Sequence, residues 1–201
     1  MLALSLKTQD IYERNGQRFD RERNKVLNEK NWIERFTRLL SPGAKILDVG
    51  CGTGEPIARY LIEQGFCLTG LDFSDGMLEM AKSRFPNNSW YLMDMCKLEL
   101  RETFEGIIAW HSFFHLTPDN QRVTLQRFAK HLMPGGALML TVGPGEGEVL
   151  GHVGDDKVYH ASLSFDEYEL LLQALDIKVL KFVPDDPECD GASVLLAQKN
   201  A

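Results

Sequence analysis

The chain has 201 residues, of which 44% are hydrophobic and 25% are charged, and its formal net charge is −7. This length and composition fit a globular protein and exclude a fibrous or a largely disordered one. The acidic balance argues against a nucleic-acid-binding surface, because such a surface needs clustered lysine and arginine side chains to neutralise phosphates.

Several sequence features indicate a cytoplasmic protein. No run of the chain approaches the roughly 18–20 apolar residues that cross a bilayer, and the N-terminal segment becomes polar too soon for a signal peptide. The four cysteines form neither a Cys-x-x-Cys pair nor a dense framework. We therefore expect free thiols in a reducing compartment.

Charge is distributed unevenly along the chain. Residues 7–38 carry nine basic and six acidic side chains, whereas residues 145–191 carry twelve acidic side chains and three lysines. A large polyanion that approached the acidic segment would be repelled. A small neutral, cationic or modestly anionic substrate is easier to accommodate there.

The first two thirds of the chain predict an α/β fold. Residues 8–40 have a helical pattern, and after them apolar runs of strand length alternate with amphipathic helical stretches. The expected strands are residues 45–49, 66–72, 89–94, 104–110 and 136–142. This alternation is typical of a parallel sheet with crossover helices on both faces. Ser74 and Asp119 suit helix N-caps, and Pro134-Gly135-Gly136 suits a helix stop before the fifth strand.

The pattern changes after residue 142. We expect a glycine-rich acidic loop at residues 143–156 and a helix near residues 164–175. Two further strands, at residues 177–183 and 192–199, predict an antiparallel end to the sheet. Because no repeat or linker marks a boundary, residues 1–201 are expected to form a single domain.

Three glycines at alternate positions follow the first expected strand, in Asp48-Val49-Gly50-Cys51-Gly52-Thr53-Gly54-Glu55-Pro56. Glycine tolerates positive φ and lets the backbone approach a ligand, and a helix that Pro56 opens supplies free N–H donors. A dinucleotide fingerprint has the spacing G-x-G-x-x-G and places a pyrophosphate at this turn. Here Asp48 and Glu55 flank a G-x-G-x-G loop and would repel a pyrophosphate. The loop therefore favours a cationic ligand.

This loop resembles the first motif of the class I S-adenosylmethionine-dependent methyltransferases. The resemblance implies a three-layer, Rossmann-like fold with a mostly parallel seven-stranded sheet, an antiparallel terminal strand and helices on both faces. It covers residues 44–143 well and the end of the sheet more loosely. It also implies that S-adenosylmethionine is the cofactor and that the first motif holds its amino-acid end, with Asp48, Gly50, Cys51, Gly52 and Gly54 as the contact residues.

Positions further along the chain extend the resemblance. Asp72 ends the second expected strand, where a carboxylate can accept hydrogen bonds from both ribose hydroxyls. Asp94 and Met95 resemble the adenine-binding corner, in which the acid accepts from the exocyclic amine and the methionine packs on the ring. The expected cofactor site also includes Phe73, Met77 and Trp110.

The loop at residues 110–116 is expected to face the transferable methyl group, since ligands of open α/β sheets bind beyond the carboxyl ends of the strands. Methyl transfer depends first on positioning and second on a base. His111 is the first candidate for a base and His115 the second, while Phe113 and Phe114 are expected to contact the substrate. The two histidines have no acid between them and directly follow a strand, so we expect no metal site.

Two segments are candidates to close over the pocket. The resemblance implies an N-terminal helical lid, in which Tyr12 and Arg18 contact the substrate. The glycines between residues 143 and 162 predict a flexible loop that brings Tyr159 to the catalytic groups and His160 to the substrate. Both segments are also compatible with a purely structural role.

We therefore expect a cytoplasmic S-adenosylmethionine-dependent methyltransferase that acts on a small molecule by in-line transfer. Residues 1–40 would form the lid, residues 44–143 the cofactor-binding core and residues 144–201 the substrate side. No metal, nucleic acid or membrane is expected as a partner, and the acceptor and the oligomeric state are not predicted. The alternatives are a non-catalytic S-adenosylmethionine-binding protein, a protein methyltransferase and an NAD(P)-dependent oxidoreductase.

Overall fold

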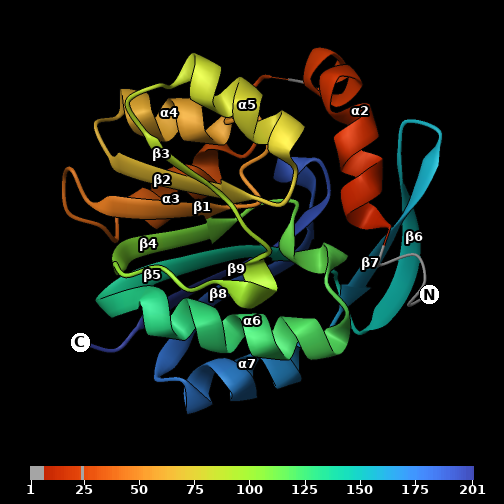
Figure 1. Cartoon of the computed structure of the whole chain (residues 1–201). Helices are drawn as coiled ribbons and strands as arrows, with labels where there is room; N and C mark the ends of the chain where they lie inside the picture. Colours follow the sequence, from red (N-terminus) through yellow and green to blue (C-terminus); the bar gives the residue numbers. More distant parts are fainter. Residues whose placement is uncertain (1–6, 24) are drawn as a thin grey trace.

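The computed structural model describes residues 7–23 and 25–201, so that residues 1–6 and 24 of the expected lid lie outside the described part. Its centre is a seven-stranded sheet in the order β3-β2-β1-β4-β5-β9-β8 (Figure 1). The strands are β1 (Lys45–Val49), β2 (Cys67–Asp72), β3 (Ser89–Leu92), β4 (Phe104–Ala109), β5 (Leu132–Val142), β8 (Ile177–Asp186) and β9 (Ala192–Lys199).

The pairing of the strands confirms the expected fold class. β1 pairs in parallel with β2 and β4, and parallel pairing continues outward to β3 and β5. β9 runs antiparallel to both of its neighbours, β5 and β8. The sheet is therefore mostly parallel with an antiparallel strand from the end of the chain, as the sequence predicts.

Helices cover both faces of this sheet. They are α2 (Thr8–Glu22), α3 (Lys30–Thr37), α4 (Ile57–Glu63), α5 (Asp75–Arg84), α6 (Pro118–His131) and α7 (Phe165–Ala174), with short 3₁₀ turns η1 (Met95–Lys97), η2 (Phe113–His115) and η3 (Pro187–Cys189). In Figure 1, α6 and α7 lie on one side of the sheet, and α4 and α5 lie on the other.

Neighbouring residues of a strand pack into two separate hydrophobic cores, because successive side chains point to opposite faces of the sheet. Ile46 packs in a cluster with Phe36 of α3 and Leu61 of α4. Its neighbour Leu47 packs in a cluster with Phe128 of α6. Burial on both faces explains why these strands read as continuous apolar runs in the sequence.

The segment expected as a flexible loop is instead a two-stranded hairpin, β6 (Gly147–Val153) with β7 (Asp156–Ser162). The strands pair antiparallel from Gly147 opposite Ser162 to Val153 opposite Asp156. Gly154 has φ +58 and opens the two-residue turn, and a Gly-Asp pair between two short runs is a recognised hairpin signal. In Figure 1 the hairpin lies beside α2, and the two elements are in contact.

Local helix signals are confirmed in part. Ser74 caps α5 by accepting a hydrogen bond from the Met77 N–H at 3.2 Å. At α6 the cap is Thr117, which accepts from the Asn120 N–H, so Asp119 lies in the first turn and is not the cap. Pro134-Gly135-Gly136 lies within β5, and α6 already ends at His131, where the strand follows directly.

Candidate functional site

The glycine loop after β1 is held closely against the loop that follows β4. Gly50 has φ +71, and a Cβ atom added there would lie 2.3 Å from the Ser112 Cβ atom. The Ser112 hydroxyl in turn donates to the Val49 carbonyl at 2.6 Å. Both the backbone conformation and the lack of space therefore require glycine at this position.

A cavity of about 550 Å³ opens above this loop, and we refer to it as the first cavity. It has the size of a small-molecule or cofactor site. Thirteen of the residues expected at the site line it: Tyr12, Gly50, Gly52, Asp72, Phe73, Met77, Asp94, Met95, Trp110, His111, Phe114, His115 and His160. They come from the ends of parallel strands, the glycine loop, α2 and the hairpin.

Asp72 is fixed by backbone donors at the floor of the first cavity. Its carboxylate accepts from the Gly52 N–H at 2.8 Å and from the Ser74 N–H at 2.9 Å. Burial raises the pKa of Asp72 to about 6, against the opposing effect of these donors. A carboxylate offers about four lone-pair sites, so acceptor capacity remains for a ligand such as a ribose diol.

Asp94 and Met95 also line the first cavity, at the start of η1. The Asp94 carboxylate accepts from the Cys96 N–H at 2.9 Å, which fixes its direction while the side chain stays exposed. Phe73 and Met77 also line the cavity. Apolar surface next to an oriented acceptor suits a flat nucleobase.

Three positions of the glycine motif do not line the first cavity. Asp48 and Cys51 are buried behind the loop, and a Cβ atom on Gly54 would meet the ring of Phe85 at 2.9 Å. Burial raises the pKa of Asp48 to about 7, while the positive charge of Arg23 opposes this. These residues therefore support the loop from behind.

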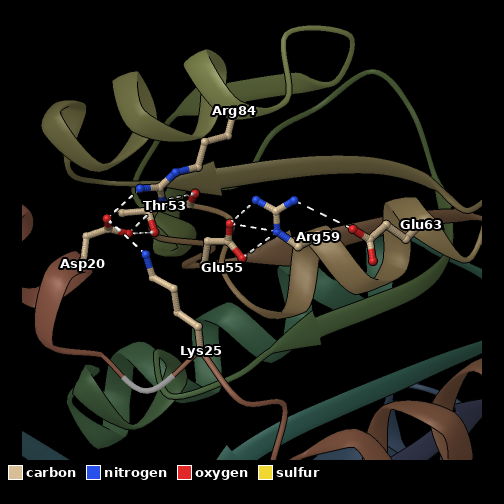
Figure 2. A network of polar contacts seen from close by, with 7 residues as sticks. All are labelled: Asp20, Lys25, Thr53, Glu55, Arg59, Glu63 and Arg84. Carbon is tan, nitrogen blue, oxygen red and sulfur yellow. Dashed lines mark hydrogen bonds and ion pairs between the residues drawn. The ribbon is translucent and has the colours of Figure 1, made fainter.

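Glu55 differs in its role from the sequence interpretation. The carboxylate is buried and ion-paired with Arg59, whose guanidinium also reaches Glu63 (Figure 2). Its charge is compensated, and it does not line the first cavity. Asp72 and Asp94 are the acids that line the first cavity, and Asp48 lies buried behind the loop.

Arg18 is not at the site, whereas Arg23 is. Arg18 is exposed and pairs with Glu22 and Asp155, and it lines neither cavity. Arg23 lines the first cavity, lies 5.6 Å above the Phe19 ring and forms no ion pair with another residue in the described ranges. Helix periodicity could have found it, because Tyr12, Phe19 and Arg23 recur on one face and position 18 does not.

His115 is a fixed, neutral side chain. Its Nδ1 lies 3.0 Å from the Tyr159 carbonyl, which can only accept, so Nδ1 carries the proton. Its Nε2 lies 2.9 Å from the Tyr12 hydroxyl and accepts from it. Burial lowers the pKa of His115 to about 4. The histidine therefore ties α2 to the site, and neither nitrogen is free to take a proton from a substrate.

His111 has an unusual backbone conformation at the end of β4. Its φ is +51, and its N–H donates to the Thr141 hydroxyl at 2.7 Å. A non-glycine residue in this region is held there by its surroundings. Its ring is open to the cavities, and desolvation by the neighbouring groups lowers its pKa to about 4.

Two expected contact residues point away from the cavities. Tyr159 is fully buried and lines neither cavity, because its strand neighbours Val158 and His160 occupy the inward face. Burial and the neighbouring Glu148 raise the pKa of Tyr159 to about 12. Phe113 is a core residue, 6.0 Å from Phe128 between ring centres, and it lines neither cavity.

A second cavity, of about 500 Å³, adjoins the first. Its walls come from the end of β5, the β5–β6 connection, β7 and the turn between β8 and β9. Three side chains line both cavities: His111, Phe114 and His160. The sequence interpretation did not place a binding site at the β8–β9 turn.

A polar network joins α2 to the glycine loop (Figure 2). Asp20 of α2 accepts from the Thr53 hydroxyl at 2.8 Å and from Arg84 Nη1 at 2.7 Å, and Lys25 lies 3.5 Å away. The guanidinium of Arg84 and the Thr53 hydroxyl hold the pKa of Asp20 well below its usual range, despite partial burial. Thr53 therefore connects the glycine loop to α2.

Residues 7–23 and 25–201 contain neither a metal-binding cluster nor a membrane-spanning helix. No group of three or more His, Cys, Asp or Glu side chains there could hold a metal ion. No helix in the same ranges is long and apolar enough to cross a membrane.

Comparison with known proteins finds a methyltransferase domain in this chain. Residues 46–136 match a family described as "Methyltransferase domain". An O-methyltransferase of Aspergillus nomiae is 28% identical over 167 residues, which are 74% of this chain and 73% of that protein. A probable tRNA methyltransferase 9B of Bos taurus is 30% identical over 138 residues, which are 66% of this chain and only 28% of the larger protein.

Solved structures agree with this match. The 1,6-didemethyltoxoflavin-N1-methyltransferase of Burkholderia thailandensis, with bound 1,6-didemethyltoxoflavin and S-adenosylhomocysteine, has a TM-score of 0.74 at 19% identity. The alignment covers 100% of this chain and 89% of that one. With its glycine loop, its acid at the end of β2 and the match over residues 46–136, the chain carries a methyltransferase domain similar to the class I S-adenosylmethionine-dependent enzymes, and S-adenosylmethionine is its cofactor.

Proposed function

We propose that the protein methylates a small molecule, with the cofactor in the first cavity and the acceptor in the second. The observation that supports this arrangement is the common wall of the two cavities, formed by His111, Phe114 and His160. Two adjoining compartments of about 550 and 500 Å³ are sized for two small ligands that must meet.

The residues of the first cavity fit the parts of the cofactor. Asp72 has free acceptor capacity for the ribose diol, and Asp94 with Met95 suits the adenine ring. Gly50 lets the backbone approach the amino-acid end, and Arg23 offers a cation to its carboxylate. When bound, S-adenosylmethionine supplies an electrophilic methyl group on a sulfonium.

The protein's own contribution is positioning. Holding two reactants in line can supply roughly 7–11 kcal/mol of the barrier. Phe114 and His160 shape the junction, and His115 with Tyr12 keeps the lid helix against it. His111 is a neutral polar group at the same junction, able to orient an acceptor by hydrogen bonding. With a pKa near 4 it is a weak base, so its expected role is to orient the acceptor.

The small-molecule assignment is supported by enclosure and by charge. α2 and the β6–β7 hairpin contribute side chains to the first cavity, and the second cavity is lined by acids without a lysine or arginine. A tRNA backbone would be repelled by such a surface. We therefore propose a small-molecule acceptor and no nucleic-acid substrate. We also propose a cytoplasmic location, and a single functional unit in which residues 1–40 form the lid.

Calorimetric titration with S-adenosylmethionine and, separately, with NADH tests the cofactor. We expect saturable binding of the first and none of the second. Incubation with methyl-labelled S-adenosylmethionine and a panel of small amines, alcohols, phenols and acids tests catalysis. S-adenosylhomocysteine should form faster with an acceptor than without one. Cofactor binding without turnover on any acceptor would instead indicate a non-catalytic binding protein.

A further inference from the structure

The second cavity has an unusual charge. The acids Glu146, Asp185 and Asp190 line it, and none of its lining residues is a lysine or an arginine. None of the three acids forms an ion pair with another residue in the described part of the chain. Three negative charges therefore face this cavity without a protein cation to neutralise them.

Two of these acids lie at the end of β8 and in the connection to β9. Asp185 and Asp190 have φ values of +45 and +51. The Asp185 N–H donates to the Ser193 hydroxyl at 3.0 Å, and the Asp190 carboxylate accepts from the Asn28 side-chain amide at 2.6 Å. The Ser193 hydroxyl also donates to the Asp185 carboxylate at 3.5 Å. These partners are uncharged, so they orient the two carboxylates without forming an ion pair.

The acids also act on the junction of the two cavities. Desolvation, Arg23 and His160 lower the pKa of His111, and the charge of Asp190 opposes this shift. Arg23 lines the first cavity and not the second. The cofactor side of His111 therefore has a cation, and the acceptor side has carboxylates.

This electrostatic arrangement distinguishes between acceptor atoms. A hydroxyl or carboxyl acceptor reacts best as an anion, which nearby carboxylates disfavour. The histidines at the junction have lowered pKa values and are weak bases. A neutral amine already has its lone pair, and the positive charge that grows on its nitrogen during transfer is stabilised by fixed carboxylates.

We infer that the second cavity takes a small amine, which Asp185, Asp190 and Glu146 attract and which is methylated on nitrogen. This inference rests on the proposed methyltransferase function. In the transfer, the nitrogen lone pair forms the new N–C bond while the C–S bond breaks and its electron pair stays on sulfur. Before this transfer the bound ammonium releases one proton to water, which frees the lone pair, and the product leaves as the methylammonium.

Matched probes test the charge preference by binding alone. The probes are 2-phenylethylamine, 2-phenylethanol and phenylacetate, which share a benzene ring suited to Phe114 and His160 but differ in charge. Each is titrated into the protein saturated with S-adenosylhomocysteine. We expect the amine to bind at least about tenfold more tightly than phenylacetate, with the alcohol between them. Equal or tighter binding of phenylacetate, or binding of none of the three, would overturn the inference.

A double variant tests the named acids. Asp185→Asn with Asp190→Asn keeps the fold, because asparagine tolerates positive φ. It should weaken binding of the amine about fivefold or more and leave the alcohol unchanged. The control, Asp166→Asn with Glu169→Gln, removes two exposed charges from α7, outside both cavities, and should change neither. An unchanged amine affinity in the first variant would contradict the inference.

Turnover separates this inference from the proposed function. The methylated products of the acceptor panel are identified by mass spectrometry. N-methyl products that fall in yield with the double variant support the amine assignment. O-methyl products alone would overturn it and leave the methyltransferase function intact. A protein that does not bind S-adenosylhomocysteine would overturn the proposed function itself.

Discussion

The two cavities that meet at His111 are built by different means. The first is formed largely by backbone-fastened groups at the carboxyl ends of β1, β2 and β4, such as Asp72 with its two N–H donors. The second is formed by a hairpin and by the turn between β8 and β9, where exposed acids form the rim. A substitution at the first cavity therefore disturbs groups that the sheet holds in place. A substitution of an exposed acid at the second cavity leaves the sheet intact.

This difference suits a division of labour. A cofactor that is always the same is best held by rigid elements. An acceptor that differs among related enzymes is best recognised by turns, since loops tolerate substitution. Equivalent substitutions in the two cavities should therefore have unequal effects, and the following experiments measure that inequality.

The largest effect is expected from Gly50→Ala. The new methyl group would lie 2.3 Å from the Ser112 Cβ atom, at a φ of +71. Left-handed strain alone costs roughly 1–2 kcal/mol, and the overlap adds to it. We expect a large fall in melting temperature and loss of S-adenosylhomocysteine binding. Gly145→Ala at the second cavity has open space and should change neither measurement. Similar losses in both variants would contradict the comparison.

Asp72→Asn should have the next largest effect. The amide preserves the shape of the side chain but loses its charge. It also has one acceptor oxygen in place of two, so it cannot accept from the Gly52 N–H, the Ser74 N–H and the ribose hydroxyls together. Losing a charge-assisted hydrogen bond costs roughly 1.5–3 kcal/mol, so cofactor affinity should fall about 10- to 100-fold by calorimetry. Asp190→Asn should leave cofactor affinity within about twofold, because its carboxylate lines the second cavity alone. Unchanged affinity in Asp72→Asn would remove this acid from the cofactor site.

The same contrast explains how far the sequence could predict the site. Asp72, Asp94 and the glycine loop occupy strand ends, where periodicity fixes both the element and its direction. Their place beside one cavity was therefore predictable. Tyr12 and Phe19 of α2 and its C-cap residue Arg23 follow one helical spacing that was readable from the sequence, although Arg18 was predicted in place of Arg23.

The second cavity was less predictable for physical reasons. Its hairpin has few apolar residues and several glycines, so the alternation of apolar and polar residues that marks a strand is weak. The main sequence signal for the hairpin was its Gly154-Asp155 turn. Tyr159 and His160 are adjacent, and only the register of β7 decides which one points inward. The positions of Asp185 and Asp190 depend on the antiparallel pairing of β8 with β9. No local sequence pattern specifies that pairing.

Asp48→Asn should affect stability in a pH-dependent way. Burial raises the pKa of Asp48 from 3.8 to about 7 in the folded protein. The folded state then binds the proton more tightly, so the free energy of unfolding falls as pH rises from about 4 to 7. Asparagine carries no charge, so the variant's free energy of unfolding should not fall in this way. We expect the variant to be more stable than the natural protein by roughly 1–3 kcal/mol at pH 8, with a smaller difference at pH 5.

Thermal or urea unfolding at the two pH values measures this difference. Asp185→Asn, which removes an exposed carboxylate at the second cavity, is run in parallel to report the effect of losing one charge. An Asp48→Asn variant that is less stable than the natural protein at pH 8 would show that the ionised carboxylate has a stabilising partner.

The smallest effects are expected at two contacts of α2, one near its C-terminal end and one at its middle. Arg84→Gln removes the cation that holds Asp20 beside Thr53, on the side of the first cavity. This pair is only partly exposed, with side-chain accessibilities of 26% and 11%, so cofactor affinity should fall about three- to tenfold by calorimetry. Arg14→Gln removes the contact between the same helix and Asp156 of the hairpin, where the side chains are 58% and 35% accessible. An exposed pair contributes roughly 0.2–1 kcal/mol, so this variant should keep cofactor affinity within about twofold. If Arg14→Gln weakened the cofactor more than Arg84→Gln, the hairpin contact would control the lid, and the two cavities would not be independent.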